Sequence, residues 1–162
     1  MAATVVLHFN DEQLRKLILR APSAVQARIR RLIEAGAVTF QRRERQEAPV
    51  GVHGGSGLRG SIRYVLHPSR LEATVEPVIS YADAVENGTR PHWVSVAPGS
   101  DLRRWAELKG INPYAVQHSI AKKGTKANRF VDRTFRAERA GVEHDIEQGL
   151  RQMIAELNDG KV

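Results

Sequence analysis

The chain contains no cysteine, and this one absence removes several kinds of site together. Disulfides, thiolate zinc sites, iron–sulfur clusters and cysteine nucleophiles are all excluded. No stretch approaches the ~18 uncharged apolar residues that a membrane-spanning helix needs, so we predict no membrane partner. Residues 1–9 carry neither a basic leader nor a small-residue cleavage site. We therefore expect no secretory signal, and synthesis in a cytoplasm.

Aromatic residues are also few, at 6%, but the apolar content is sufficient for a core. Hydrophobic residues make up 41% and charged residues 27% of the 162 residues, a composition typical of globular proteins. This length lies within the usual range for one domain. We predict a single domain over residues 1–162.

Basic charge is concentrated in one segment. The formal net charge is +7, and residues 15–45 hold nine basic side chains against two acidic ones, which is also a net +7. Such a segment indicates either a face for DNA phosphates or an acidic partner, or simply a solvated helix face. The candidate basic face consists of Arg28, Arg31, Arg42 and Arg45.

Two long amphipathic helices are predicted, over residues 23–47 and 131–157. Ser23 is the expected cap of the first helix, and Pro49 limits its end because a residue before proline disfavours helical ψ. In each helix the apolar residues recur at helical spacing on one face. The two stripes are Val25, Ile29, Leu32, Ile33, Gly36 and Phe40, and Val131, Phe135, Val142, Ile146, Leu150, Met153 and Leu157.

Extended segments are short. Residues 4–9 are β-branched and aromatic, which indicates a strand or an extended arm, and a helix is predicted to begin at Asn10, so residues 1–22 form an N-terminal arm. Residues 58–66 and 70–78 favour a β-hairpin, because apolar and polar residues alternate in the second run. The glycine-rich residues 50–60 predict a mobile loop.

The part between the hairpin and the last helix predicts small helices. Residues 81–86 favour a helical turn closed by Asn87-Gly88, and residues 93–96 a further strand. Two short helices are expected at 102–108 and 113–122, the second capped by Asn112. The predicted fold class is therefore α+β: a small antiparallel β-sheet packed by two long amphipathic helices, with short extra helices in an insertion, residues 93–127.

No catalytic or metal-binding pattern is recognisable. The six histidines lie far apart, without HxxxH or HxH spacing, and no GxSxG, GxxxxGK[ST] or GxGxxG motif is in a suitable context. Residues 54–57 (GGSG) resemble a phosphate cradle, but no lysine and helix start follow them, so a flexible loop is favoured. We expect no enzyme activity, no metal and no cofactor.

Residues 102–122 also resemble a helix-turn-helix, with Gly110 in the turn and basic residues nearby. The second helix offers few side chains for reading bases, chiefly Gln117 and His118. A small basic DNA-binding module is therefore kept as the alternative hypothesis.

Three segments, in order, carry a more specific signal. Residues 56–62 (SGLRGSI) resemble the TGxLRxSI element of the gene-ten-product-like neck proteins of long-tailed, lambdoid bacteriophages. Residues 81–92 (YADAVENGTRPH) are similar to their YAxxVExGTxPH element. Residues 124–126 (GTK) and 129–135 (RFVDRTF) are similar to their GTxxxPFLxPAF element. Ser56 replaces the usual threonine, and Asn128-Arg129 stands where proline is frequent.

The resemblance covers roughly residues 23–157 and implies a non-enzymatic virion protein of the head–tail junction. Such proteins are neck, tail-completion or minor tail components, assembled as rings between the portal–adaptor stack and the tail tube. The implied partners are further copies of the chain and the adjacent adaptor, connector and tail proteins, with passing genomic DNA bound at most weakly. The implied location is the virion, after synthesis in the host bacterial cytoplasm.

Assembly-interface candidates follow from the same segments. Arginine is favoured at protein interfaces, which selects Arg59 and Arg90, with ordinary solvent exposure as the other interpretation. His92 and Trp93, which follow Arg90 after Pro91, complete the set, and the loop of residues 50–60 is expected to be mobile in the free subunit and to become ordered on assembly. Trp93 and Trp105 are more often core residues than interface anchors, and that interpretation is favoured for both.

Overall fold

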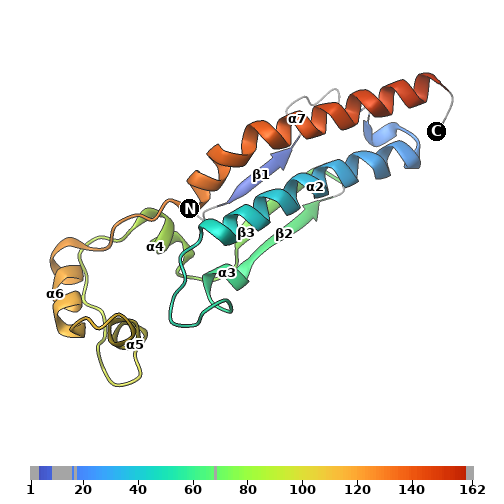
Figure 1. Ribbon diagram of the computed structural model, residues 1–162. Helices are drawn as coiled ribbons and strands as arrows, with labels where there is room; N and C mark the ends of the chain where they lie inside the picture. The colour runs from blue at the N-terminus through green and yellow to red at the C-terminus, as the bar shows by residue number, and fades with distance from the viewer. Residues whose placement is uncertain (1–3, 9–15, 17, 68, 160–162) are drawn as a thin grey trace.

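In the computed structural model, which describes residues 4–8, 16, 18–67 and 69–159, a small antiparallel sheet is packed by two long helices (Figure 1). The predicted α+β class is confirmed. The strands are β1 (Val5–His8), β2 (Ile62–His67) and β3 (Glu72–Pro77). The helices are α2 (Ser23–Glu47), α3 (Leu58–Ser61), α4 (Ala82–Asn87), α5 (Asp101–Leu108), α6 (Pro113–Lys123) and α7 (Phe130–Asn158).

The sheet has the order β1-β3-β2, so the hairpin strand β3 is central and the N-terminal strand pairs with it. Val5 lies opposite Val75, and Ile62 lies opposite Pro77. The side chains of Val5, Val75, Ile62 and Ala73 are buried, while alternate residues such as Val65 face solvent. The period-2 pattern of the hairpin is thus a sheet with one buried face.

Helix α2 lies on the buried face of the sheet, and its bounds agree with the prediction. Its N-cap is Pro22, which makes no side-chain hydrogen bond. The prediction that Ser23 caps the helix was wrong: Ser23 is already helical, since the Gln26 N–H donates to the Pro22 carbonyl (3.1 Å).

Helix α7 packs antiparallel along α2 at close range. A Cβ built on Gly36 would lie 2.8 Å from Val142 Cγ1, and one on Gly149 would lie 2.4 Å from Leu32 Cδ2. Each helix therefore contributes a glycine at which the other helix inserts an apolar side chain. The two helices are therefore closer together than larger residues at positions 36 and 149 would permit.

The apolar stripe of α7 is buried only in part. Val131, Val142 and Met153 lie in the core, but Phe135 and Leu157 are exposed, in contrast to the prediction. Phe135 lies at the edge of the helix pair and stacks on Phe40, with ring centroids 6.3 Å apart. The Arg139 guanidinium lies 5.6 Å from the Phe135 centroid.

One predicted strand start and one predicted strand were wrong. Residues 58–61 form the helical turn α3 instead of the first half of a strand, because Leu58 turns into the core and the Ser61 N–H donates to the Gly57 carbonyl (3.1 Å). Residues 93–96 lie in no strand, since no described strand pairs with them. The Gln117 side chain instead donates to the Val94 carbonyl (2.7 Å).

The predicted insertion contains the two short helices, α5 and α6, which we call the α5–α6 unit (residues 93–127). It lies at one end of the elongated molecule, beyond α4 and the start of α7 (Figure 1). Asn112 caps α6 as expected, with its side chain accepting from the Tyr114 N–H (2.9 Å). At the other terminus, Ile18 is buried in the core, whereas the predicted helix start at Asn10 lies outside the described residues.

Candidate assembly interface

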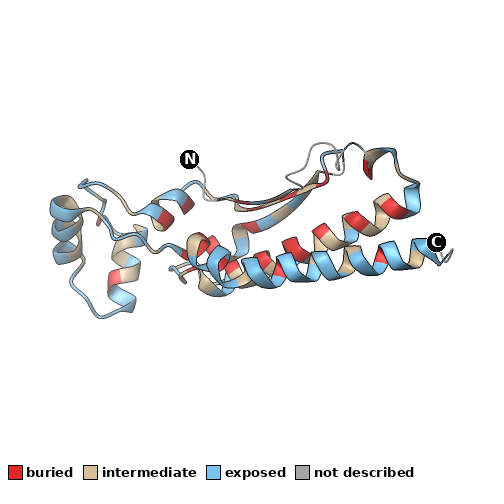
Figure 2. Ribbon diagram, turned by 90° about the horizontal axis from the view of Figure 1, so that it is seen from above, coloured by how far each residue is buried: buried red, intermediate tan, exposed pale blue. Residues whose placement is uncertain are grey.

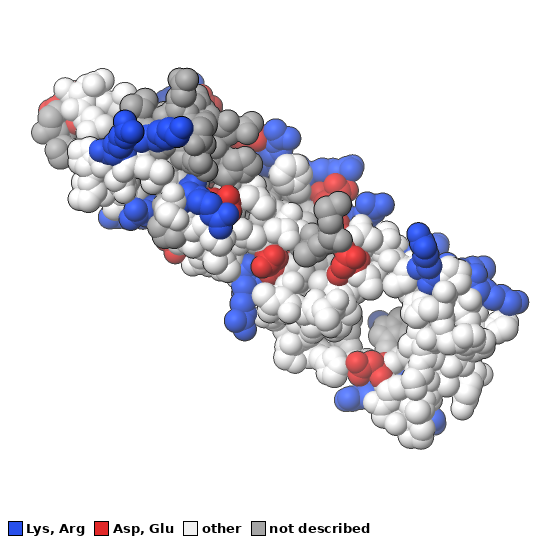
Figure 3. All heavy atoms as spheres, turned by 180° about the vertical axis from the view of Figure 1, so that it is seen from behind, with Lys and Arg blue, Asp and Glu red and all other residues white. Residues whose placement is uncertain are grey.

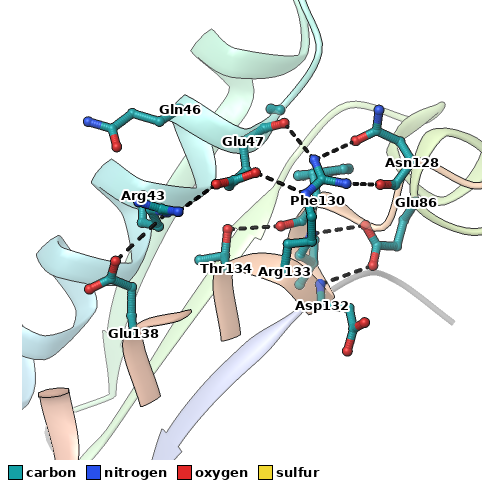
Figure 4. A network of polar contacts seen from close by, with 12 residues as sticks. Arg43, Gln46, Glu47, Glu86, Asn128, Phe130, Asp132, Arg133, Thr134 and Glu138 are labelled. Carbon is teal, nitrogen blue, oxygen red and sulfur yellow. Dashed lines mark hydrogen bonds and ion pairs between the residues drawn. The ribbon is translucent and has the colours of Figure 1, made fainter. Parts of the chain in front are cut away.

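The three motif segments are far apart in the sequence but meet at one end of the α2–α7 pair. Residues 56–62 form α3 and the start of β2, residues 81–92 contain α4, and residues 124–135 lead into α7. Figure 4 shows the end of α2, residues of α4 and the start of α7 joined by polar contacts. We call this region the motif junction.

Glu86 of α4 caps the N-terminus of α7. Its carboxylate accepts from the Val131 N–H (2.9 Å) and from the Asp132 N–H (3.1 Å), as Figure 4 shows. The first N–H groups of a helix have no partner within the helix, and they attract negative charge. A carboxylate that is 45 positions earlier in the chain therefore fixes where the last helix begins.

The chain enters and leaves the α5–α6 unit through two segments that pair with each other at Thr89 and Thr125; we call this pair the neck of the unit. The Thr89 N–H donates to the Thr125 carbonyl (3.2 Å), and the Thr125 N–H donates to the Thr89 carbonyl (3.3 Å). Gly88 and Gly124 precede the two threonines and have φ values of 74° and 71°. A Cβ on Gly124 would lie only 1.8 Å from the Thr89 carbonyl oxygen, so the close approach requires glycine.

A chain of charges joins α2 to α7 beside this cap. Arg133 Nε donates to Glu47 Oε2 (2.9 Å), and Arg133 also bonds Asn128. Arg43 pairs with Glu47 (2.8 Å) and lies near Glu138 of α7 (3.8 Å) (Figure 4). The hydrogen bond from Arg133 is the main reason why the pKa of Glu47 is below its ordinary value.

Glu44 of α2 is an acidic side chain inside the apolar core. It is fully buried, and neither carboxylate oxygen has a hydrogen-bond partner in the structure as described. Burial, with a smaller contribution from the charge of Glu86, raises its pKa to about 8. The side chain is therefore mainly a neutral carboxylic acid at pH 7.

The structure separates the four interface candidates into two places. Arg59 lies at the motif junction, where its Nε donates to the Ala48 carbonyl (2.8 Å) and its guanidinium also reaches the Gln46 carbonyl. It thus binds the carbonyls that end α2. Arg90, His92 and Trp93 are exposed together at the base of the α5–α6 unit.

Trp93 is not a core residue, so the favoured interpretation was wrong for it. Its side chain is 71% exposed, because the segment after Pro91 runs along α6 without entering an apolar cluster. Trp105, on α5, is half-buried. His92 Nδ1 lies 2.8 Å from the Arg90 carbonyl oxygen, which holds the imidazole close to the neck.

The candidate basic face does not form one continuous surface. Arg28 binds Glu156 of α7 in a two-bond contact, one bond of which is 3.0 Å long, and Arg45 donates to the Ile62 carbonyl (2.8 Å). Arg31 and Arg42 are exposed, and no contact with another described side chain is recorded for either. They lie eleven residues apart and therefore share one face of α2.

Charge on the opposite side of the molecule is dispersed. Figure 3 shows Lys and Arg side chains along the whole length of that face, several of them at the α5–α6 end, with acidic groups between them. Among the described residues, no group of three or more His, Asp or Glu side chains could hold a metal ion. Within the same residues, no helix is long and apolar enough to cross a membrane.

A second surface feature was not foreseen from the sequence. A groove of about 520 Å³ lies between β1, α2 and α7. Val6, Leu7, Phe135, Val142 and Ile146 are among its apolar lining residues, and Arg139, Glu143 and Glu147 are its charged ones. The apolar stripe of α7 gave one signal for it, since the predicted stripe includes Phe135, Ile146 and Leu150, which line the groove.

Glu44 and Glu86 were also missed. Glu44 continues the buried stripe one turn after Phe40, so its position in the helical pattern could have indicated burial. For Glu86 no local signal exists, because its partners are backbone N–H groups of a distant helix. No family model, no curated protein and no solved structure matches this chain.

Proposed function

We propose that this chain is a structural protein of a bacteriophage or prophage virion. In this proposal it acts at the head–tail junction, as a neck, tail-completion or minor tail component, and assembles as a ring subunit. Its partners are further copies of itself and the adjacent adaptor, connector and tail proteins. It is made in the bacterial host and has no catalytic role.

The observation that carries the proposal is the convergence of the three motif segments at the motif junction. Their polar groups make structural contacts: Glu86 caps α7, Arg59 binds the end of α2, and the two Gly-Thr pairs form the neck. Motif residues of an enzyme would instead direct free acids, bases or nucleophiles into a cleft. The arrangement favours a motif that specifies a fold and the placement of a projecting unit.

Exposed apolar surface supports an assembly role. The α5–α6 unit projects from the body and carries Trp93 in an exposed position next to Arg90. Tryptophan and arginine are enriched among the residues that dominate binding at protein interfaces. A ring subunit needs such a surface, whereas an isolated monomer gains nothing from it.

The direct test is the composition of particles from a phage or induced prophage that encodes the chain. We expect mass spectrometry of purified particles to detect the chain in several copies, and deletion of its gene to yield heads and tails that do not join. Supplying the chain from a plasmid restores joining. Absence of the chain from the particles, with normal joining in the deletion, contradicts the proposal.

A further inference from the structure

The α5–α6 unit exposes large apolar side chains that its own structure does not use. Leu108 is 75% exposed, Trp93 71%, Tyr114 61% and Ile111 44%. Leu108, Ile111 and Tyr114 lie within the seven residues 108–114, around the turn that joins α5 to α6. The buried hydrophobic residues described within 93–127 are only Val96 and Ala106. The three exposed side chains of residues 108–114, which we call the knob, are available for a partner.

The groove between β1, α2 and α7 is a receptor of suitable size on the same chain. At about 520 Å³ it is large enough for bulky side chains, and its lining is mainly apolar. Val6 and Phe135 remain partly exposed in it. The groove lies along the helix pair, and the knob is carried by the unit at one end of the molecule (Figure 1), so they are separate surfaces.

The charges around the two surfaces are opposite in sign. Residues 93–127 contain six basic and two acidic side chains, a net charge of +4. The charged side chains that line the groove are Glu143, Glu147 and Arg139, a net charge of −1. Complementary charge raises the rate of encounter and selects the orientation of two partners.

We propose that the knob of one copy of this chain inserts into the β1–α2–α7 groove of the next copy. This inference rests on the proposed function as a ring subunit and specifies the contact between subunits. Because knob and groove are different surfaces, the contact is heterologous and leaves one free knob and one free groove at the ends of every oligomer. Such a contact closes into a ring when the rotation per subunit permits it.

The absence of cysteine makes a cross-linking test direct. One variant carries Tyr114→Cys in the knob, and a second, with a size tag, carries Glu143→Cys at the groove; both positions are exposed. The two are mixed at up to about 1 mM, where even millimolar contacts are substantially occupied, and treated with a short bismaleimide. The control pairs Tyr114→Cys with Ile154→Cys, which is exposed on α7 but does not line the groove.

We expect a mixed covalent dimer from the knob–groove pair and at least about tenfold less from the control pair. The double variant with both cysteines in one chain should give a ladder of covalent oligomers. No mixed dimer, equal yields in the control, or cross-links mainly between two knobs would overturn the proposal. A knob-to-knob product would indicate an isologous contact instead.

A second measurement uses no cross-linker. Tyr114→Ser should lower the apparent association constant in sedimentation at least about tenfold, while the matched surface variant Ile154→Ser leaves it unchanged. Equal effects of the two substitutions would count against the contact. Particle composition separates this inference from the function: a chain present in particles but without the cross-link refutes only the contact, and a chain absent from particles refutes the function.

Discussion

The body of the molecule and the α5–α6 unit are stabilised in different ways. The body buries one continuous apolar cluster formed by α2, α7, the sheet and α4, and none of its buried members lies between Gly88 and Arg129. Figure 2 shows the contrast, with buried residues along the helix pair and the sheet and few in the α5–α6 unit. The unit is stabilised instead by local hydrogen bonds, such as the one from the Asn112 cap of α6, and by the paired backbone of the neck.

This difference indicates that the two regions have different tasks. Free energy from apolar burial makes the body a rigid base, since burial is the dominant favourable contribution to folding. A region with few buried contacts opens locally at low cost and can adapt to a partner. The three most exposed of the large apolar side chains in the described residues, Leu108, Trp93 and Tyr114, lie in the adaptable region, where a contact with a partner benefits from adjustment.

The largest expected effect is a core truncation in the body. Phe40 is fully buried in α2, so Phe40→Ala should lower the free energy of unfolding by about 3–5 kcal/mol. Trp93→Ala removes a larger side chain but should change it by only about 0.5 kcal/mol or less, because the residue is exposed. Denaturant unfolding measures both. Comparable losses for the two variants would mean that the α5–α6 unit belongs to the same cooperative core.

The next effect depends on pH and concerns Glu44. Its folded pKa of about 8 is above the ordinary value of 4.5, so the unfolded chain releases the proton at lower pH than the folded chain does. Stability from this group is therefore complete below pH 4.5 and is lost as pH rises through about 8, with a slope of at most about 1.4 kcal/mol per pH unit. Glu44→Gln should remove most of this slope.

Thermal unfolding from pH 4 to 9 tests the prediction, with Glu34→Gln as the matched control. Glu34 lies on the same helix but is only half-buried and accepts a hydrogen bond from Tyr64 (3.1 Å). The control should keep the slope of the unaltered chain. If Glu44→Gln keeps it as well, the buried carboxyl is not the cause.

How far the sequence predicts this fold depends on how local each signal is. The bounds of α2 and the Asn112 cap follow from prolines and a cap within one turn. The misassigned strand at 93–96 has the β-branched and aromatic pattern of a strand, but pairing requires a partner strand, and none of the described strands lies there. Glu86 as the cap of α7, and the groove, depend wholly on tertiary packing.

A smaller and local effect is expected at the neck. In Gly124→Ala the new Cβ would overlap the Thr89 carbonyl, so the neck must open, in addition to a cost of about 1–2 kcal/mol for the positive φ. Gly110→Ala is the matched control, since φ is 67° there but no atom lies near the new Cβ. Hydrogen exchange should show faster exchange throughout α5 and α6 only in Gly124→Ala, with the body unchanged. Equal behaviour of the variants would mean that the neck does not hold the unit.

The smallest expected effect concerns DNA, and it compares the exposed cations of the two regions. For the proposed ring we expect only weak, sequence-independent binding, because a ring channel that held phosphates tightly would retard a genome that must slide through it. Each phosphate contact contributes about 0.9 to the slope of log affinity against log salt, through counterion release. Removing Arg31 and Arg42 from the body, or Lys122 and Lys123 from the α5–α6 unit, should therefore lower that slope by at most about 2 if those side chains line the channel.

A DNA titration at two salt concentrations measures the slope for the unaltered chain, the two double variants and a control. The control has Arg28 replaced, because its guanidinium is already bound to Glu156. The double variant with the larger decrease identifies the region that faces the DNA. Binding by the unaltered chain that survives about 200 mM salt and prefers one sequence would contradict the structural function, because a specific reader discriminates by about 1–3 kcal/mol per base pair. That result would instead favour the small DNA-binding module, with Gln117 and His118 on α6 as its base-reading side chains.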